Sequence, residues 1–149
     1  MEQRIHINKL HEHTNKEVLI AGWVNVRRDH GKLIFIDIRD ATGKIQMVAI
    51  PSNKEAHAVA ETVRPEWVIE VTGKVNKRPP KMVNHEEKNG DIEIELLSMK
   101  VLNESKTPPF EITGDTLGVE ETTRLKYRYL DLRTERMQHN LKIRSQFVQ

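Results

Sequence analysis

Phe35 stands in a run of alternating side chains, Leu-Ile-Phe-Ile-Asp-Ile-Arg, and the pattern places it among polar groups. Alternate residues of an extended strand point to opposite faces, so Phe35 shares a face with Asp37 and Arg39, while the isoleucines form the other face. A flat ring on a polar face can stack on an unpaired nucleic-acid base, which contributes roughly 1–3 kcal/mol per base. The alternative is that Phe35 caps a barrel or packs under a loop.

Basic residues flank this aromatic residue in two segments. Residues 27–31 are Arg-Arg-Asp-His-Gly, and residues 77–81 are Lys-Arg-Pro-Pro-Lys. Cations of this kind attract a phosphate backbone, and amide, guanidinium and carboxylate groups recognise the edges of bases in single-stranded RNA. The two segments therefore favour a nucleic-acid-binding face with an aromatic centre and a basic rim.

Two other groups of residues suggest different chemistry, but the sequence favours a structural role for both. Three histidines before residue 17 lie in a polar stretch with no fixed fourth ligand, so a solvated loop is expected there and no metal site. Asp37 and Asp40 have Arg39 between them, which favours ion pairing over catalysis by paired carboxylates. The three histidines are His6, His11 and His13.

Five segments have the composition of β-strands, being rich in β-branched and aromatic residues and separated by turn-forming residues. Residues 53–64 place apolar residues at helical spacing instead. Ser52 and Glu55 match a capping box at the start of this helix, and Pro65 is expected to end it. The five expected strands are 17–27, 33–39, 44–50, 67–77 and 91–102.

The order of these elements is three strands, a helix and two strands, which is the order of an OB-fold. We therefore predict an all-β protein built on a five-stranded OB-fold barrel, with one helix between the third and fourth strands. In such barrels, oligonucleotides bind to the face of strands two and three, beside the loops that join strands one to two and four to five. Phe35 and the two basic segments lie at these places in the sequence.

The sequence changes character after the fifth strand. Residues 103–123 are rich in Pro, Gly, Thr and acidic residues and carry a net charge of −4, whereas residues 124–149 carry +5. Asp131 is expected to tie the connecting segment down, and a helical pattern follows it. The predicted divisions are an OB-fold domain over 1–102, a connector or hinge over 103–133, and the truncated start of a further domain over 134–149.

The composition excludes several classes of protein. The 149 residues include no cysteine, which rules out disulfides, thiolate nucleophiles and zinc sites built on sulfur. No apolar run approaches the roughly 20 residues of a membrane span, and the first residues lack the apolar core of a signal peptide, so a cytoplasmic location is expected. The net charge is only +2, and residues 1–102 carry +1. Any affinity for RNA must therefore come from well-placed groups and not from bulk charge.

Several motifs together resemble the N-terminal anticodon-binding domain of class II aminoacyl-tRNA synthetases, a domain type that the aspartyl, asparaginyl and lysyl enzymes share. The run RRDHGKLIFIDIRD at residues 27–40 is most similar to the bacterial-type aspartyl-tRNA synthetases. The other motifs are Gly22-Trp23-Val24, Val71-Thr72-Gly73, Arg78-Pro79, Thr107-Pro108-Pro109-Phe110 and the run from Arg124 to Arg133.

This resemblance implies roles for five residues in binding an anticodon. Phe35 corresponds to the aromatic residue that stacks on the middle base, and Gln46 corresponds to the amide that pairs with that uracil. Arg28 corresponds to a guanidinium on the anticodon loop, Arg78 to the residue that reads the first base, and Glu93 to a reader of an outer base. Residues expected to add specificity or backbone contacts are Arg27, His30, Lys77 and Lys81.

The resemblance also implies a parent enzyme that joins aspartate to tRNA with ATP and Mg, acts as a homodimer and has no membrane partner. In that family the first helix of the catalytic domain begins near residues 140–149, so this chain is expected to end inside it. We expect the chain itself to be a monomer that holds no cofactor, binds a tRNA with a GUC anticodon and does not aminoacylate it.

Three alternatives remain open from the sequence. The parent enzyme could be non-discriminating and also charge the asparagine tRNA, which differs at the third anticodon base. The barrel could be a free-standing OB-fold protein that binds single-stranded nucleic acid without sequence preference, or a barrel that binds only proteins. Binding to loops that carry GUC, GUU or a changed middle base separates these possibilities.

Overall fold

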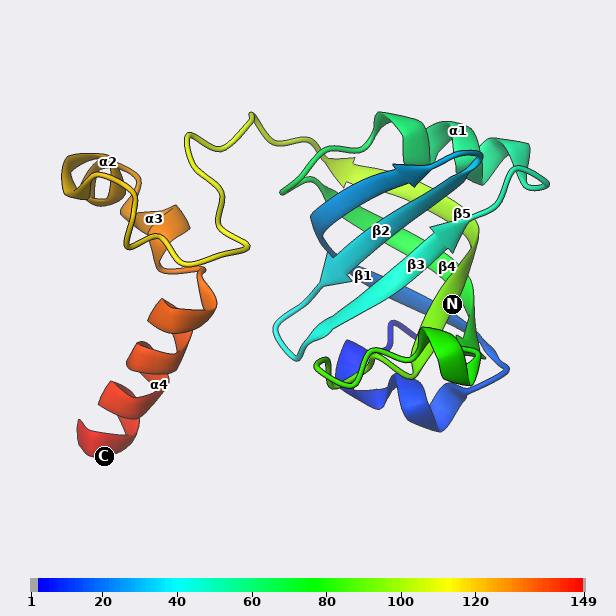
Figure 1. Cartoon of the computed structure of the whole chain (residues 1–149), viewed down its shortest axis with the longest axis horizontal. Helices are drawn as coiled ribbons and strands as arrows, with labels where there is room; N and C mark the ends of the chain where they lie inside the picture. The colour runs from blue at the N-terminus through cyan, green and yellow to red at the C-terminus, as the bar shows by residue number, and fades with distance from the viewer. Residues whose placement is uncertain (1–2, 149) are drawn as a thin grey trace. The chain divides into compact units, whose positions relative to one another are not determined.

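Alternating apolar and polar residues along five segments produce five strands, which close into a barrel in the computed structural model of residues 3–148 (Figure 1). Around the barrel the order is β1-β2-β3-β5-β4, with β3 and β5 paired in parallel and all other neighbours antiparallel. A helix, α1 (Lys54–Thr62), joins β3 to β4, so the predicted OB-fold barrel is confirmed. The strands are β1 (Glu17–His30), β2 (Leu33–Arg39), β3 (Lys44–Ala49), β4 (Val68–Lys77) and β5 (Ile92–Asn103).

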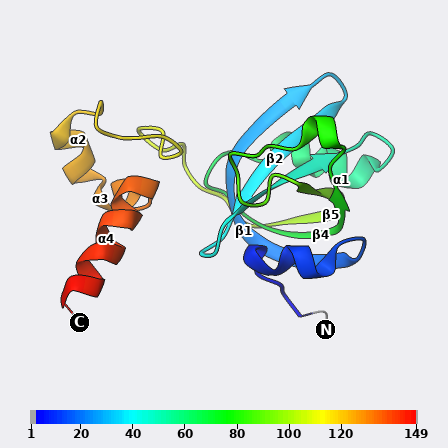
Figure 2. The same ribbon diagram turned by 60° about the horizontal axis from the view of Figure 1, so that its bottom comes forward.

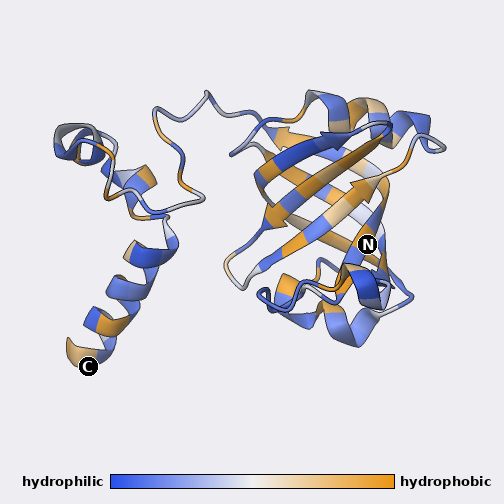
Figure 3. Ribbon diagram, in the orientation of Figure 1, coloured by the Kyte–Doolittle hydropathy of each residue, from blue (hydrophilic) through white to orange (hydrophobic). Residues whose placement is uncertain are grey.

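The inward-facing residues of the strands form the core, and Figure 3 shows the resulting alternation of apolar and polar residues along each strand. In β2, Ile34, Ile36 and Ile38 are at most 4% exposed, as their spacing predicts. In β3, the sequence left both faces plausible, and the structure buries residues 45, 47 and 49. Gln46 consequently points to the outside, on the same side of the sheet as Phe35.

The first hairpin is tighter than the sequence predicts. β1 continues to His30, which pairs with Leu33, so residues 27–30 belong to a strand and not to a loop. The turn is reduced to two residues, and Gly31 has a φ of 61°, a left-handed value that glycine adopts without steric cost. Arg28 and His30 are therefore held by backbone pairing beside β2.

The N-terminal stretch corrects another expectation, because it is a 3-10 helix, η1 (Ile7–His13), and not a solvated loop. Ile7 and Leu10 are completely buried in the barrel core. A 3-10 helix has three residues per turn, so side chains three apart lie on the same face. Figure 1 shows η1 in dark blue at the end of the barrel opposite α1, and Figure 2 brings this end forward. We call η1 the N-terminal strap.

Asp40 connects the strap to the turn between β2 and β3. Its carboxylate accepts hydrogen bonds from the backbone N–H groups of Thr42 (2.7 Å), Gly43 (3.1 Å) and Ile7 (3.1 Å). His6 lies 3.3 Å from the same carboxylate. The side chain of Asp40 is only 2% exposed, so these donors replace the water that it would otherwise bind.

The start of α1 differs from the predicted capping box. Asn53, and not Ser52, is the N-cap, and its side-chain oxygen accepts from the N–H of Ala56 at 3.3 Å. The Asn53 side-chain amide also donates to the carbonyl of Leu97 in β5 at 2.5 Å. An asparagine can make both contacts at once, whereas a serine hydroxyl could not reach both partners, which explains why the helix begins one residue later.

The described chain divides into one unit that ends at Thr107 and another that begins at Pro108. Two short helices lie within the expected connector, and a longer helix follows at the place where a helical pattern was predicted. None of the helices within residues 3–148 has the length and apolar character that a membrane crossing requires. The three helices are α2 (Glu121–Lys126), α3 (Arg128–Asp131) and α4 (Glu135–Val148).

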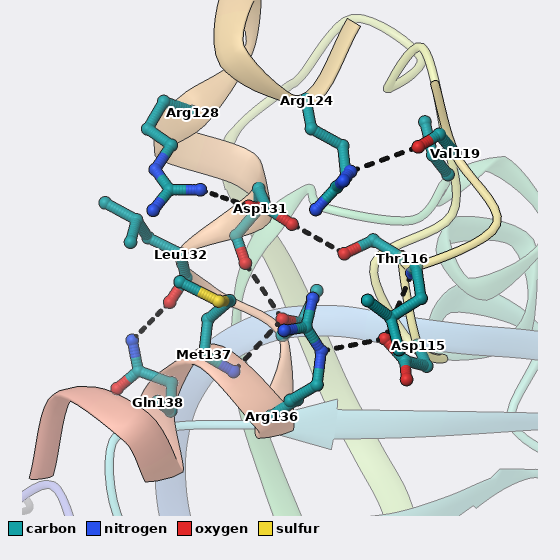
Figure 4. A network of polar contacts seen from close by, with 12 residues as sticks. Asp115, Thr116, Val119, Arg124, Arg128, Asp131, Leu132, Arg136, Met137 and Gln138 are labelled. Carbon is teal, nitrogen blue, oxygen red and sulfur yellow. Dashed lines mark hydrogen bonds and ion pairs between the residues drawn. The ribbon is translucent and has the colours of Figure 1, made fainter. Parts of the chain in front are cut away.

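A network of polar contacts centred on Asp131 holds the second unit together (Figure 4). Asp131 is fully buried, and its carboxylate accepts from the Thr116 hydroxyl at 2.5 Å and from Arg128 Nη1 at 2.7 Å. Arg136 Nε donates to Asp115 at 2.9 Å in the same network. Asp131 thus has the structural role that the sequence predicts, since it ties the segment before α2 to α3.

Candidate nucleic-acid interface

Seven residues line a depression of about 430 Å³ on the outer face of the barrel. They come from β1, β2, β3 and β5 and from the loop between β4 and β5. All five residues that the resemblance assigns to anticodon binding are brought together here, and His30 lies with them. The lining consists of Arg28, His30, Phe35, Gln46, Arg78, Met82 and Glu93. We call this site the outer depression.

Phe35 points outward because its neighbours Ile34 and Ile36 fill the core. In the β1–β2 ladder it lies directly opposite Arg28. The ring of His30 lies 5.8 Å from that of Phe35, centroid to centroid, with the two planes 80° apart. Such an edge-to-face contact is favourable and restricts the rotation of the ring. Phe35 is therefore an oriented aromatic platform on a polar face.

A polar network lies beside this platform. Arg28 Nη2 is 3.0 Å from both carboxylate oxygens of Asp37 and 3.3 Å from Oε1 of Gln46. Asp37 and Gln46 face each other across the β2–β3 ladder. Burial raises the pKa of the Asp37 carboxyl, and the positive charge of Arg28 opposes that rise. Beside the platform, the Arg28 cation thus joins a partly desolvated carboxylate to an amide.

Arg78 and Glu93 bring a second pair of charges to the lining. The backbone N–H of Arg78 donates to the carbonyl of Asp91 at 2.8 Å, which fixes the start of the β4–β5 loop. Arg78 Nε lies 3.6 Å from Glu93 Oε2, too long for a good hydrogen bond but close enough for charge attraction. The Arg78 side chain is only 9% exposed, and its Nε has no hydrogen-bond partner among the described residues.

Two residues of the site were not assigned from the sequence. Met82 lies in a short 3-10 helix, η2 (Pro80–Met82), and is 59% exposed at the outer depression. The sequence feature that could have identified Met82 is its apolar side chain in an otherwise basic loop. Asp37 was expected to pair with Arg39, but it pairs with Arg28, while Arg39 bonds to Glu66 at 2.5 Å. Arg39 is on the same face as Asp37, but Asn25 (2.8 Å) and Glu66 hold its guanidinium, whereas the Arg28 guanidinium reaches Asp37.

Three of the residues expected to add specificity or backbone contacts lie outside the lining. Lys77 and Lys81 are exposed at the surface. Arg27 faces the other way from Arg28, since neighbouring residues of a strand alternate. Its Nη1 donates to the carbonyl of Glu61 at the end of α1 at 2.5 Å, and its Nη2 lies 2.7 Å from the Asp29 carboxylate. We therefore expect Arg27 to support the fold and not to contact RNA.

Two of the three N-terminal histidines each lie against a single carboxylate. His11 lies 2.9 Å from Asp91, and His6 lies 3.3 Å from Asp40. Within the described residues, no group of three or more His, Cys, Asp or Glu side chains is arranged to hold a metal ion.

Residues 18–102 match the tRNA anti-codon family, which is described as an OB-fold nucleic acid binding domain. The match spans all five strands except for single residues at two ends. It includes every residue that lines the outer depression.

Similar proteins support the resemblance seen in the motifs. The chain is 48% identical over 134 residues to an aspartate–tRNA ligase of Staphylococcus aureus strain Newman, a match that covers 89% of this chain and 23% of the relative. The chain thus spans less than a quarter of the length of the curated relatives it matches. The resemblance predicted from the motifs is confirmed.

Solved structures of related enzymes share the fold. An aspartyl-tRNA synthetase from Entamoeba histolytica superposes with a TM-score of 0.83 at 21% identity, over 97% of this chain and 35% of that one. An asparaginyl-tRNA synthetase from Pyrococcus horikoshii gives 0.80 at 24% identity, over 99% of this chain and 33% of that one. At these identities the likeness establishes the fold alone.

Proposed function

Because the chain belongs to the tRNA anti-codon family of OB-fold nucleic acid binding domains, we propose that its outer depression binds the anticodon loop of a transfer RNA. The observation that carries the proposal is the convergence of Phe35 with hydrogen-bonding side chains from four other parts of the barrel. Single-stranded loops expose unstacked bases, which proteins recognise by aromatic stacking and by hydrogen bonds to the base edges.

We further propose that the bound loop carries the GUC anticodon of the aspartate tRNA. In this proposal Phe35 stacks on the middle base and Gln46 pairs with that uracil. Arg28 contacts the loop, Arg78 reads the first base, and Glu93 reads an outer base. The support is the 48% identity to an aspartate–tRNA ligase over most of the chain and the clustering of the five side chains.

The chemical reaction is assigned to a longer parent protein, and the binding step to the barrel. The parent is proposed to be a cytoplasmic homodimer that joins aspartate to its tRNA, using ATP and Mg²⁺ as cofactors. The barrel supplies selection of the tRNA by its anticodon. In isolation the 149-residue chain is proposed to be monomeric and to bind tRNA without aminoacylating it.

A titration of the 149-residue chain with anticodon stem-loops tests this function. We expect clear preference for a GUC loop over a GAC loop, because the changed middle base disrupts both the stacking geometry and the contact with Gln46. Equal affinity for the two loops would indicate a general single-strand-binding OB-fold. No binding at low salt would indicate a protein-binding barrel.

A third loop, GUU, addresses selectivity between the aspartate and asparagine tRNAs. If the chain binds GUC more tightly than GUU, the barrel itself discriminates the aspartate tRNA from the asparagine tRNA. Equal binding of both, together with rejection of GAC, identifies the domain of a non-discriminating ligase.

A further inference from the structure

A single nitrogen of Arg28 joins two other side chains of the outer depression. Nη2 carries two hydrogens, and it lies 3.0 Å from both oxygens of the Asp37 carboxylate and 3.3 Å from Oε1 of Gln46. One hydrogen can be shared between the carboxylate oxygens while the other is donated to the amide oxygen. Asp37 and Gln46 are thus connected through Arg28, although they come from different strands.

This contact determines which end of the Gln46 amide faces a ligand. An amide has an oxygen that accepts and a nitrogen that donates. The guanidinium only donates, so only the oxygen is stable beside it, and a flipped amide would place two donors against each other. The Nε2 group of Gln46 makes no hydrogen bond to another residue in the described part of the chain, and Gln46 lines the outer depression.

We propose that Asp37 is a positioning residue: it holds Arg28 against the Gln46 oxygen, so that Gln46 offers its N–H donors to the middle base. This inference rests on the proposed function. Uracil presents the oxygen O4 where cytosine presents the N4 amine, an acceptor in the first case and a donor in the second. A Gln46 fixed as a donor therefore accepts uracil and rejects cytosine, two bases of nearly equal size and stacking surface.

Asp37 is suited to this role by its place on the sheet. Its side chain is 19% exposed, whereas that of Arg28 is 47% exposed, so the carboxylate is the fixed partner of the pair. A long, half-exposed arginine loses rotamer freedom when it is held in one position, and Asp37 is what holds it. Lys44, Arg78 and Glu87 also act electrostatically on Asp37, but none of the three bonds to it in the described chain.

The test compares GUC and GCC stem-loops bound to the 149-residue chain at one fixed salt concentration. We expect the natural chain to prefer GUC by at least about tenfold, since one well-placed pair of hydrogen bonds discriminates between bases by this amount or more. In Asp37→Ala the ratio of the two dissociation constants should fall by about tenfold, because the freed Gln46 amide can turn and accept from cytosine. In Asp37→Glu, which keeps the charge, part of the preference should return.

Asp29→Ala is the matched control. It removes the same charge from the same hairpin, but Asp29 pairs with Arg27 and does not line the outer depression. Its GUC-to-GCC ratio should stay within about twofold of the natural chain. A natural chain that rejects GAC but binds GUC and GCC equally would overturn the inference and leave the proposed function standing. An unchanged ratio in Asp37→Ala would also overturn it.

A second measurement works without any substitution and covers the case in which Asp37→Ala does not fold. In the natural chain, the side-chain N–H₂ signals of Gln46 can be followed by nuclear magnetic resonance during titration. They should shift strongly with the GUC loop and much less with the GCC loop. If both loops shift these signals equally, Gln46 does not act as a fixed donor and the inference fails.

Discussion

Asp37 lies on the outer face of the barrel, and Asp40, three residues later, lies at the barrel end. The two carboxylates differ in the kind of hydrogen-bond donor that they accept from. At the barrel end, three backbone N–H groups donate to Asp40, whose side chain is 2% exposed. On the outer face, Arg28 is the only residue in the described part of the chain whose side chain donates to Asp37, which is 19% exposed. Backbone donors cannot leave without unfolding, whereas side-chain donors can rotate. The hydrogen bonds at the barrel end therefore stay formed as long as the protein is folded. The side chains of the outer face can rearrange and form hydrogen bonds with a ligand.

The acidity of the two carboxyls reflects this difference. For Asp37, burial raises the pKa more than Arg28 lowers it. For Asp40, burial also pushes the pKa upward, but hydrogen bonds from Thr42, Ile7 and His6 outweigh it and leave the pKa below its ordinary value. Asp40, which accepts more hydrogen bonds from the described residues, has no proposed part in recognition. Asp37, which accepts fewer, is the proposed positioning residue.

The largest effect is expected from Asp40→Ala. Three backbone N–H groups would lose a charged acceptor together, so the free energy of unfolding should fall by about 3 kcal/mol. Urea denaturation at pH 7 measures this loss. Asp29→Ala is the control, because the ion pair of this solvent-exposed carboxylate should contribute little to stability. If both variants lose the same stability, the two regions do not differ as described.

The next largest effect is expected from Phe35→Ala, on the outer face. Loss of the stacking platform should weaken binding of the GUC stem-loop by about 1–3 kcal/mol, measured by titration. Leu33→Ala is a matched control, since Leu33 lies on the same face of β2 and is 36% exposed but does not line the outer depression. An equal loss in Leu33→Ala would show that the face binds by general contact and not through Phe35.

A smaller effect separates the neighbours Arg27 and Arg28. Arg27→Ala should lower the free energy of unfolding by about 1 kcal/mol, because it breaks hydrogen bonds to the end of α1. Its affinity for the GUC loop should stay within about twofold. Arg28→Ala should show the reverse pattern, with weaker RNA binding and little change in unfolding. RNA titration and denaturation of both variants test whether Arg27 acts on stability and Arg28 on RNA binding. Equal effects of the two variants in both measurements would contradict this division.

The pH dependence of stability should differ in sign between the two carboxyls. Because the pKa of Asp40 is lowered on folding, its contribution is present above the ordinary value of 3.8 and is lost as pH falls through the folded value. Because the pKa of Asp37 is raised, its contribution is present at low pH and is lost as pH rises through the folded value. Denaturation of the natural chain, Asp40→Asn and Asp37→Asn between pH 7 and pH 3 measures both slopes. Slopes of the same sign would contradict this assignment.

The smallest effect concerns salt. Residues 1–102 carry a net charge of only +1, so binding should depend on placed groups and the affinity should fall only gently as salt increases. The logarithm of the dissociation constant, plotted against that of the salt concentration, measures the slope. About ten phosphate contacts would produce a steep slope. A slope that steep would contradict the view that the outer face recognises bases through a few side chains.

Much of the barrel was predictable because strand alternation is a local property. The isoleucines of β2 placed Phe35 outside, and the order of the elements predicted the OB-fold. Gln46 was harder to place, since both faces of β3 are largely apolar and only pairing with β2 and β5 decides between them. The Asn53 cap depends on the carbonyl of Leu97, which is distant in sequence.

Arg27 shows how one boundary changes the assignment of a site. Treated as part of a loop, residues 27–31 form a single basic cluster. Once β1 extends to His30, alternation places Arg27 and Asp29 on the side of α1, and Arg28 and His30 beside Phe35. The N-terminal strap was missed for a related reason, because a 3-10 turn in polar sequence becomes stable only when the barrel receives its two apolar side chains.

The N-terminal strap has a consequence for the order in which the chain can fold during synthesis. His11 contacts Asp91, 80 residues further along the chain, and the backbone of Asn15 bonds to Val75. The ribosome adds about 5–20 residues per second, so several seconds pass between the synthesis of the strap and that of its last partner. Ile7 and Leu10 are made before the strands whose side chains bury them. Contacts of this long range slow folding, and they make the chain most prone to aggregation before β5 emerges.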